Sequence, residues 1–269
     1  MTKPVSKTAF YCGGVRMSDA RSDDPLVGDT FAERLMGPDG EAVFESFRGF
    51  DRENASNIVR HRIIDDLLRE RFKGHPERLT VLIGAGLDTR AFRMRTGTWV
   101  EFDEPEIIER KERLLPAASC PVPLRRIPIE FAHERLEEKL APFVTDKRVS
   151  VVMEGVTMYL DEADMRATAQ TLCRLFPVHS LICDFTTAAF FRRYGARVHR
   201  QIEALGARFT WTPDDPVGVM ASSGYRLVNR VSIPLRAAEL GRLRAPVWLI
   251  RRFLPSLRDG YSVHVFKPE

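Results

Sequence analysis

The chain has 269 residues, of which 44% are hydrophobic and 29% are charged. This composition excludes a disordered chain, a collagen-like chain and a disulfide-stabilised miniprotein, and the length suffices for a large core. The net charge is only +4 and both signs are interspersed, so we expect no nucleic-acid partner despite a sequence pI near 9.0.

The spacing of the four cysteines, at positions 12, 120, 173 and 183, matches neither a zinc motif nor a redox Cys-x-x-Cys pair. We therefore expect reduced thiols and no metal site. No stretch approaches the roughly 18 uncharged apolar residues of a membrane span, and the N-terminus lacks the apolar segment of a signal peptide. These features predict a soluble, cytoplasmic protein without a membrane partner.

The chain is expected to form one domain, residues 1–269, with two parts. Residues 1–50 are dense in charge, Pro and Gly and predict a helical or irregular cap. Apolar residues then recur at helical spacing over 51–72 and are followed by a glycine and a proline, which predicts a helix that ends there. Residues 1–75 are thus a small N-terminal helical cap with its lead-in helix, and 76–269 form an α/β core.

The core alternates short apolar runs with longer amphipathic runs, a pattern that predicts a mostly parallel sheet with helices on both faces. Helices are expected over 104–115, over 161–176 with Asp161 as N-cap, and over 188–205. The expected strands, in chain order, are Thr80–Ile83, Trp99–Phe102, Arg126–Ile129, Val149–Met153, Leu181–Phe185, Tyr225–Ile233 and Tyr261–Phe266.

A glycine-containing turn follows the first strand of this core, in the segment LTVLIGAGLDTRAFRM. Gly84-Ala85-Gly86 allows a sharp strand-to-helix turn and lets a ligand lie against bare backbone. A purely structural tight turn would use the same residues. The third position of the dinucleotide fingerprint is Thr89 instead of Gly or Ala, which disfavours NAD without excluding it.

An acidic residue stands at the end of the next strand. Asp103 follows Gly84 by 19 residues, and an acid near that spacing accepts hydrogen bonds from ribose hydroxyls in doubly wound folds. The turn and the acid together predict an adenosine-type ligand. Alternatively, Asp103 caps the helix that starts near Glu104-Pro105. Glu101 would point away from the site because side chains alternate along a strand.

Two further charged residues are candidates for the same ligand edge. Glu154 follows the apolar strand Val149–Met153, and a carboxylate there needs a partner because burying it unpaired is costly. Arg62, on the helix before the first strand, can neutralise a ligand carboxylate, but it can equally be an exposed, solvated arginine.

The motifs VLIGAGLDTRAFR, EFDEPEIIERK and MEGVTMYL together resemble the leucine carboxyl methyltransferase and tetracenomycin-type polyketide O-methyltransferase family, a branch of the class I S-adenosylmethionine (SAM)-dependent methyltransferases. The likeness runs from about residue 6 to the final strand and is strongest over 79–160. It implies a Rossmann-like α/β fold with a seven-stranded, mostly parallel sheet that binds SAM across the carboxyl ends of the first four strands.

The resemblance also implies roles for individual residues. Arg62 matches the position that pairs with the methionine carboxylate, Asp103 the ribose-binding acid and Glu154 the acid near the methionine amino group. Glu130-Phe131 stands where the family usually has Asp-Leu beside the adenine, so the longer Glu arm departs from the pattern. The implied cofactor-binding residues are Arg62, Gly84, Ala85, Gly86, Asp103, Glu130, Phe131 and Glu154.

The expected function is therefore SAM-dependent O-methylation of a small molecule, a polyketide-like carboxylic acid or phenol. A carboxylate acceptor is ionised near neutral pH and needs no general base, so proximity can carry the rate without a catalytic acid or base. Candidate acceptor contacts are Tyr159 and Arg21, together with Phe190, Phe191 and Trp211, although aromatics at such spacings are more often core.

Three alternatives remain open at this point. The chain could methylate a protein C-terminal carboxylate, as the resemblance allows, or it could be an NAD(P)-dependent oxidoreductase built on the same turn and acid. It could also be a non-catalytic protein that binds a partner through the basic helix around Val247–Leu257. The sequence leaves the oligomeric state undetermined.

Overall fold

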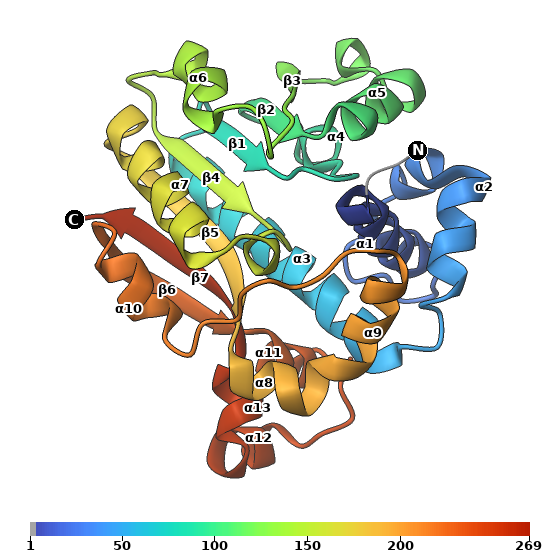
Figure 1. The fold of residues 1–269 in the computed structure, drawn as a ribbon. Coiled ribbons are helices and arrows are strands. Elements are labelled where there is room, and N and C mark those ends of the chain that lie inside the picture. The colour runs from blue at the N-terminus through green and yellow to red at the C-terminus, as the bar shows by residue number, and fades with distance from the viewer. Residues whose placement is uncertain (1–3) are drawn as a thin grey trace.

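The computed structural model describes the backbone of residues 4–269 and the side chains of residues 6–269. A seven-stranded sheet lies at its centre, in the order β3-β2-β1-β4-β5-β7-β6 (Figure 1). Only β7 runs antiparallel to its neighbours. The strands are β1 (Leu79–Ile83), β2 (Thr98–Asp103), β3 (Leu124–Pro128), β4 (Val149–Met153), β5 (His179–Thr186), β6 (Tyr225–Ser232) and β7 (Tyr261–Pro268). The predicted Rossmann-like, mostly parallel sheet is confirmed.

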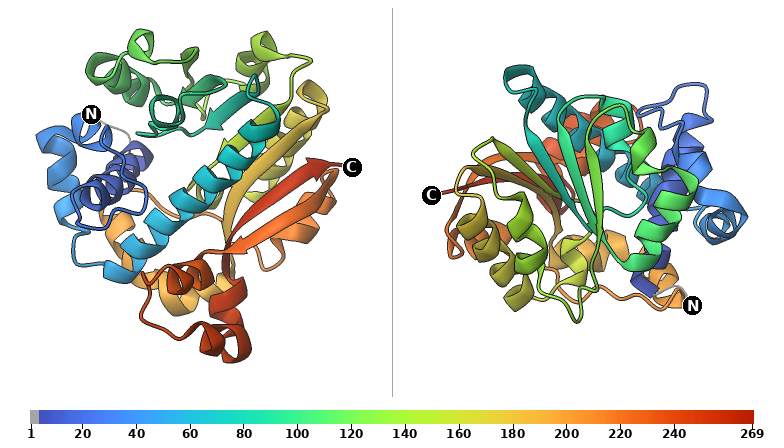
Figure 2. Two further views of the ribbon diagram at one scale, coloured as in Figure 1. Left: turned by 180° about the vertical axis from the view of Figure 1, so that it is seen from behind. Right: turned by 90° about the horizontal axis from the view of Figure 1, so that it is seen from above.

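The sheet is buried on both faces, as expected for short apolar runs such as β1 and β4, whose residues are all buried. One core packs residues from both the cap and the strands, including Leu82 and Val152. The other packs the alternate strand residues, including Val81 and Val151, against the helices of the opposite face. Figure 2 shows these helices on either side of the strands.

The cap consists of three helices, α1 (Pro4–Ala20), α2 (Ala32–Glu45) and α3 (Asp51–Gly74). The predicted helix over 51–72 is confirmed as α3. The helices α1 and α2 pack closely, because a Cβ built on Gly14 of α1 would lie 2.2 Å from Phe44 Cγ of α2. The first 50 residues are therefore mainly helical.

The remaining helices connect or cover the strands. They are α4 (Arg90–Met94), α5 (Pro105–Leu114), α6 (Leu136–Leu140), α7 (Glu162–Leu175), α8 (Ala188–Phe190), α9 (Ala196–Ala204), α10 (Pro216–Ala221), α11 (Ile233–Glu239), α12 (Val247–Phe253) and α13 (Pro255–Asp259), with short η1 (Ala117–Ser119), η2 (Ala141–Phe143), η3 (Thr157–Tyr159) and η4 (Phe191–Gly195). Asp161 caps α7 as predicted, accepting a hydrogen bond from the Asp164 backbone N–H at 2.7 Å.

Two helical predictions differ from the structure. The single helix predicted over 188–205 is interrupted by η4, one turn of π-helix that ends at Gly195. The helix expected around Val247–Leu257 is divided into α12 and α13 because Pro255 cannot continue a helix that precedes it. Among residues 4–269, no helix is both long enough and apolar enough to cross a bilayer.

The order of the strands also determines where a crevice forms at the edge of the sheet. The chain adds strands outward on one side of β1 and then returns to add β4 on the other side, so the loops after β1 and β4 diverge. In open α/β sheets, ligands bind outside the carboxyl ends of the strands at such a reversal. The residues that follow β1, β2 and β4 therefore lie where this fold binds its ligands.

Candidate functional site

A cavity of about 840 Å³ lies at the carboxyl ends of β1, β2 and β4. The loop Gly84–Asp88 after β1 forms part of its wall, and so do Asp103 after β2 and Met153–Val156 after β4. The cap completes the opposite wall with Ser6, Thr8, Ala9, Cys12 and Arg16 of α1 and with Arg60 of α3. The site is thus shared between the sheet and the cap.

The turn after β1 adopts a backbone conformation that requires glycine. Gly84 has φ +68° and Gly86 has φ +51°, in the left-handed region that other residues rarely adopt. A Cβ on Gly84 would lie 2.5 Å from Val156 Cγ2. The backbone N–H groups of Gly84 and Ala85 donate to the Phe102 carbonyl at 2.9 and 3.1 Å, which fixes the turn against β2.

Asp103 joins this turn to the start of α5. Its Oδ2 accepts from the Gly86 backbone N–H at 2.5 Å, and its Oδ1 accepts from the Glu104 backbone N–H at 2.7 Å. Asp103 lines the cavity, whereas the N-cap of α5 is Glu104 and this helix has no side-chain cap, so the alternative prediction that Asp103 caps α5 is wrong. Burial raises its pKa to about 6, although the two backbone hydrogen bonds act in the opposite direction.

The prediction that Arg62 lines the ligand edge is wrong. Its Nε pairs with Asp66 Oδ1 at 2.9 Å and its Nη1 donates to the Leu26 carbonyl at 2.8 Å, on the exposed side of α3. Successive helical residues are separated by about 100°, so Arg60 points to the opposite side, into the cavity. Arg60 is the arginine that meets Glu154, with Nε 3.2 Å from Oε1.

Arg60 is buried, and its Nε and Nη1 are held by protein oxygens, whereas its Nη2 lies 3.7 Å from Cys12 Sγ. Its Nη1 donates to the Tyr261 hydroxyl at 2.8 Å and lies 3.3 Å from Asp184 Oδ2. Asp184 in turn accepts from the Gly155 backbone N–H at 2.7 Å. These contacts connect the loop after β4 to α3, β5 and β7, and together they fix the position of the Arg60 guanidinium.

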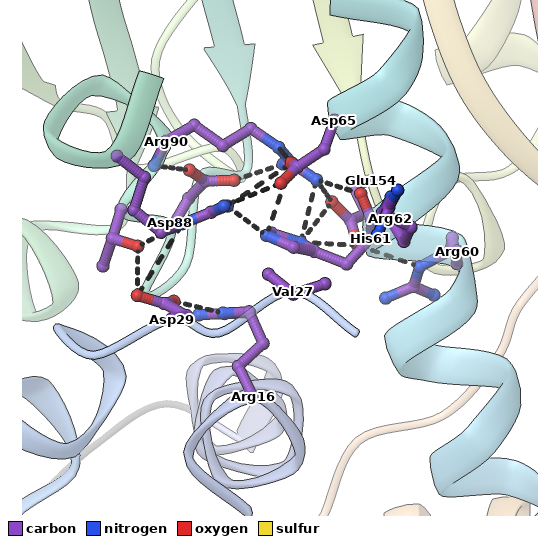
Figure 3. A network of polar contacts seen from close by, with 12 residues as sticks. Arg16, Val27, Asp29, Arg60, His61, Arg62, Asp65, Asp88, Arg90 and Glu154 are labelled. Atoms are coloured by element: carbon purple, nitrogen blue, oxygen red, sulfur yellow. Dashed lines mark hydrogen bonds and ion pairs between the residues drawn. The ribbon is translucent and has the colours of Figure 1, made fainter. Parts of the chain in front are cut away.

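A second arginine, Arg90, lies in a buried network of polar contacts (Figure 3), and it lines the cavity together with Asp88 and Glu154. Its Nε donates to Asp65 Oδ1 at 2.6 Å, its Nη2 donates to Glu154 Oε2 at 2.7 Å, and its Nη1 pairs with Asp88. His61 Nδ1 lies 3.1 Å from the same Glu154 oxygen. Burial lowers the pKa of His61, and the charge of Arg90 lowers it further, so the imidazole is neutral near pH 7.

These arginines also set the charge of the carboxylates. Burial alone would raise the pKa of Glu154, but Arg90 and its other partners hold that pKa well below its usual value. Asp65 and Asp88 follow the same pattern, with Arg90 the largest influence opposing burial. Glu154 is therefore an ionised acceptor at neutral pH and a poor proton acceptor.

The network extends from the core into the cap. Arg93 Nη1 pairs with Asp65 Oδ2 at 2.7 Å, and its Nε lies 3.7 Å from Asp29 Oδ1. Arg16 of α1 pairs with Asp29 Oδ2 at 3.0 Å and donates to the Leu87 carbonyl at 2.7 Å. Because Leu87 follows the glycine turn directly, these bonds attach α1 to the cavity wall.

One group in the network has the residue types of a metal site. Ligand atoms of His61, Asp88 and Glu154 lie within 4.8 Å of one another. Arg90 donates to both carboxylates, and its Nη2 lies 2.8 Å from His61 Nδ1. A guanidinium thus occupies the position that a cation would need.

Other predicted residues divide between the cavity and the surface. Tyr159 lines the cavity, and its ring packs edge-on against Phe209 with centroids 5.4 Å apart. Arg21 does not reach the cavity, because it pairs at the surface with Glu33 at 2.6 Å and Glu41 at 3.0 Å. The prediction for Arg21 is wrong in position.

The segment after β3 departs from the prediction at one residue. Phe131 lines the cavity and is 38% exposed, whereas Glu130 does not line it. The Glu130 backbone N–H donates to Glu134 Oε2 at 2.9 Å, and Glu134 takes the place in the wall expected for Glu130. The aromatics Phe190, Phe191 and Trp211 also lie outside the wall and pack against Tyr261, Phe209 and Phe185, respectively.

Several residues of the site were not predicted, namely Arg60, His61, Asp65, Asp88, Arg90, Arg93, Asp184 and Tyr261. A signal existed for some of them. His61, Asp65 and Leu68 fall three or four residues apart on α3, on the face that its apolar residues bury. Polar residues on a buried helical face indicate internal partners.

Known proteins resemble this chain in sequence. The leucine carboxyl methyltransferase family profile matches residues 11–173. The tetracenomycin polyketide synthesis O-methyltransferase TcmP of Streptomyces glaucescens is 29% identical over 215 residues, which are 79% of this chain and 76% of that protein. A putative SAM-dependent methyltransferase of Mycolicibacterium gilvum is 31% identical over 179 residues, which are 60% of each chain.

Solved structures resemble it in fold. A DUF574 family protein from Streptomyces avermitilis has a TM-score of 0.55 at 13% identity and matches over 97% of both chains. Magnesium protoporphyrin IX methyltransferase from Synechocystis, solved with bound S-adenosylhomocysteine (SAH), has a TM-score of 0.52 at 12% identity over 89% of this chain and 99% of that one. At these identities the likeness concerns the fold alone.

Proposed function

Because the chain belongs to the leucine carboxyl methyltransferase family and is a SAM-dependent methyltransferase, we propose that it transfers the methyl group to an oxygen of a small molecule, a carboxylate of a polyketide-like compound. The family assignment displaces the oxidoreductase and the non-catalytic alternatives. Methylation of a protein C-terminal carboxylate remains a second candidate, because it would use the same donor cavity.

The residues around the cavity fit the donor group by group. Gly84 and Gly86 leave the backbone of the turn bare, so a donor can lie directly against it. There is no room for a side chain at Gly84, because a Cβ there would contact Val156. Arg60 would hold the methionine carboxylate in place of the predicted Arg62, and Glu154 would hold the amino group. Asp103 would accept from the ribose hydroxyls, because each carboxylate oxygen can accept more than one hydrogen bond.

The charge of the buried network also suits a cationic donor. Four arginines face five carboxylates in it, so the network carries no excess of positive charge to repel a sulfonium. Its members are Arg16, Arg60, Arg90 and Arg93 and Asp29, Asp65, Asp88, Glu154 and Asp184. Bound SAM supplies an activated methyl group, so the protein needs to orient the acceptor and exclude water.

The state of the cavity side chains favours an acceptor that arrives ionised. Glu154 is held as a carboxylate by arginines, and burial raises the pKa of the Tyr159 hydroxyl above its usual value. Neither group accepts a proton readily at neutral pH. A carboxylic acid is already ionised there and can attack without a base, whereas a phenol with a pKa near 10 is mostly protonated.

The observation that carries the proposal is the convergence of Arg60, Glu154 and Asp103 with the glycine turn on one cavity. A matched pair of variants on α3 tests the donor part. Arg60→Lys keeps the charge but loses the forked geometry, so we expect SAH to bind more than tenfold more weakly by calorimetry. Arg62→Gln should change that affinity less than twofold. Equal effects of the two substitutions would contradict the assignment.

The acceptor part is tested by the bond that is formed. Turnover of methyl-labelled SAM with naphthoic acid is compared with turnover of the matching naphthol. A methyl ester releases labelled methanol in mild alkali, whereas a methyl ether does not. We expect alkali-labile product from the acid. A product stable to alkali, formed from the naphthol alone, would refute carboxylate transfer while leaving the donor assignment intact.

A further inference from the structure

An exposed aromatic pair lies far from the donor cavity. Trp248 and Phe253 of α12 are 65% and 60% exposed, and their rings meet edge to face with centroids 6.2 Å apart. Ile250 on the other side of the helix is fully buried and anchors it. Helix α12 lies at one end of the molecule, beside α11 and α13 (Figures 1 and 2).

The surroundings of this pair are basic. Arg251 and Arg252 lie three and four residues after Trp248 and therefore share its side of the helix. Arg251 pairs with Glu239 at 2.8 Å, but within residues 6–269 neither Arg252 nor the exposed Arg244 has an ion-pair partner. Between 188 and 259 the chain carries thirteen Arg and five Asp or Glu, a net charge of +8 against +4 for the whole chain.

We propose that Trp248 and Phe253, with Arg244 and Arg252, form a peripheral docking site for an anionic lipid surface. Two exposed aromatic rings that touch gain free energy in an apolar environment, and the unpaired Arg252 next to Phe253 gains it from negative charge. A bilayer with anionic headgroups offers the negative layer outside and the apolar layer behind it. Tryptophan is the residue that favours this boundary.

Charge decides against a second copy of the chain as the occupant. An isologous contact would place the unpaired Arg244 and Arg252 of one copy opposite the same basic patch of the other. The inference departs from the expectation of no membrane partner, but it concerns attachment at the surface and no spanning helix. It is independent of the proposed methyl transfer, because the residues lining the donor cavity end at Arg174 in the sequence.

The test uses the full chain and two kinds of vesicle, phosphatidylcholine alone and phosphatidylcholine with about one-third phosphatidylglycerol. We expect cosedimentation with the anionic vesicles only, and weaker binding at high salt. Trp248 reports insertion by a blue shift of its emission, because Trp99 is fully buried and Trp211 is partly buried.

Two variants and two controls locate the site. Trp248→Ser should abolish cosedimentation with the anionic vesicles, and Arg252→Glu should lower vesicle affinity about 25-fold, or about fivefold for each unit of charge. Both variants should bind SAH like the parent protein. The exposed Val178→Ser and Arg34→Glu, outside the patch, should leave vesicle binding unchanged.

Each contrary result overturns the inference. The inference would be overturned if the chain bound no vesicles, if it bound both kinds of vesicle equally, or if binding survived Trp248→Ser. A stable dimer in solution that Trp248→Ser converts to a monomer would also overturn it, because a second copy would then cover the patch.

Discussion

The pKa of Asp103 leads to the sharpest prediction. Burial raises this pKa to about 6, against 3.8 for an ordinary aspartate. In the protein without donor, ionising Asp103 therefore lowers stability as the pH rises from about 4 to about 6. Ribose hydroxyls would donate to the ionised form, so binding of the donor should lower the pKa and release a proton.

The consequence is a pH-dependent donor affinity. At pH 5 about one-tenth of Asp103 is ionised, whereas at pH 7 nearly all of it is. We expect SAH to bind roughly tenfold more weakly at pH 5 than at pH 7, with the affinity levelling off above about pH 7. Calorimetry in buffers of different ionisation enthalpy measures both the affinity and the released proton.

Substitution separates this cause from general acid sensitivity. Asp103→Asn keeps the shape of the side chain but removes the charge, so SAH affinity at pH 7 should fall by about 1–3 kcal/mol and lose its change between pH 5 and 7. Near-UV circular dichroism at both pH values controls for folding. A variant that retains the full pH dependence would refute the ribose role of Asp103.

Three further predictions concern the turn, the network and the acceptor side. Gly84→Ala should weaken SAH binding strongly and lower stability by more than about 1 kcal/mol, because Gly84 has a positive φ and its Cβ would contact Val156. Gly49→Ala, where a Cβ would meet open space, should change neither SAH affinity nor stability to that extent. Calorimetry measures the affinity, and denaturant melts measure the stability. Asp65 and Glu154 have lowered pKa values, so the stability they contribute is present above about pH 4 and is lost as the pH falls below it; equal urea midpoints at pH 6 and pH 3.5 in the Asp103→Asn variant, which lacks the opposing change at Asp103, would contradict this. Tyr159→Phe should reduce kcat/KM for the acceptor about five- to tenfold with SAH affinity unchanged, and a parallel loss of SAH affinity would place Tyr159 on the donor side.

The sequence predicted features that depend on local pattern. The order of apolar runs indicated the sheet, and the segment Gly84–Gly86 with Asp103 at a fixed spacing indicated the crevice. Both follow from rules that act over about twenty residues. The interruption of the helix over 188–205 was missed because nothing in that stretch excludes a continuous helix as firmly as a proline would.

The buried network could not be predicted in the same way. Arg90 meets Glu154 across 64 positions of sequence, and Arg60 meets Asp184 across 124. Which of two arginines on α3 faces the cavity depends on the rotation of that helix against the sheet. Arg62 was the wrong choice because it lies two residues from Arg60 and therefore on the opposite side of the helix.

The attachment of α1 has a practical consequence for anyone shortening this protein. One wall of the donor cavity is formed by Ser6, Ala9 and Cys12 of α1, and Arg16 attaches that wall to the Leu87 carbonyl. Deletion of α1 would remove this wall and let bulk water reach the methyl group of the donor. Such a shortened enzyme would be expected to bind its donor more weakly and to orient the acceptor poorly, while its central sheet stayed intact.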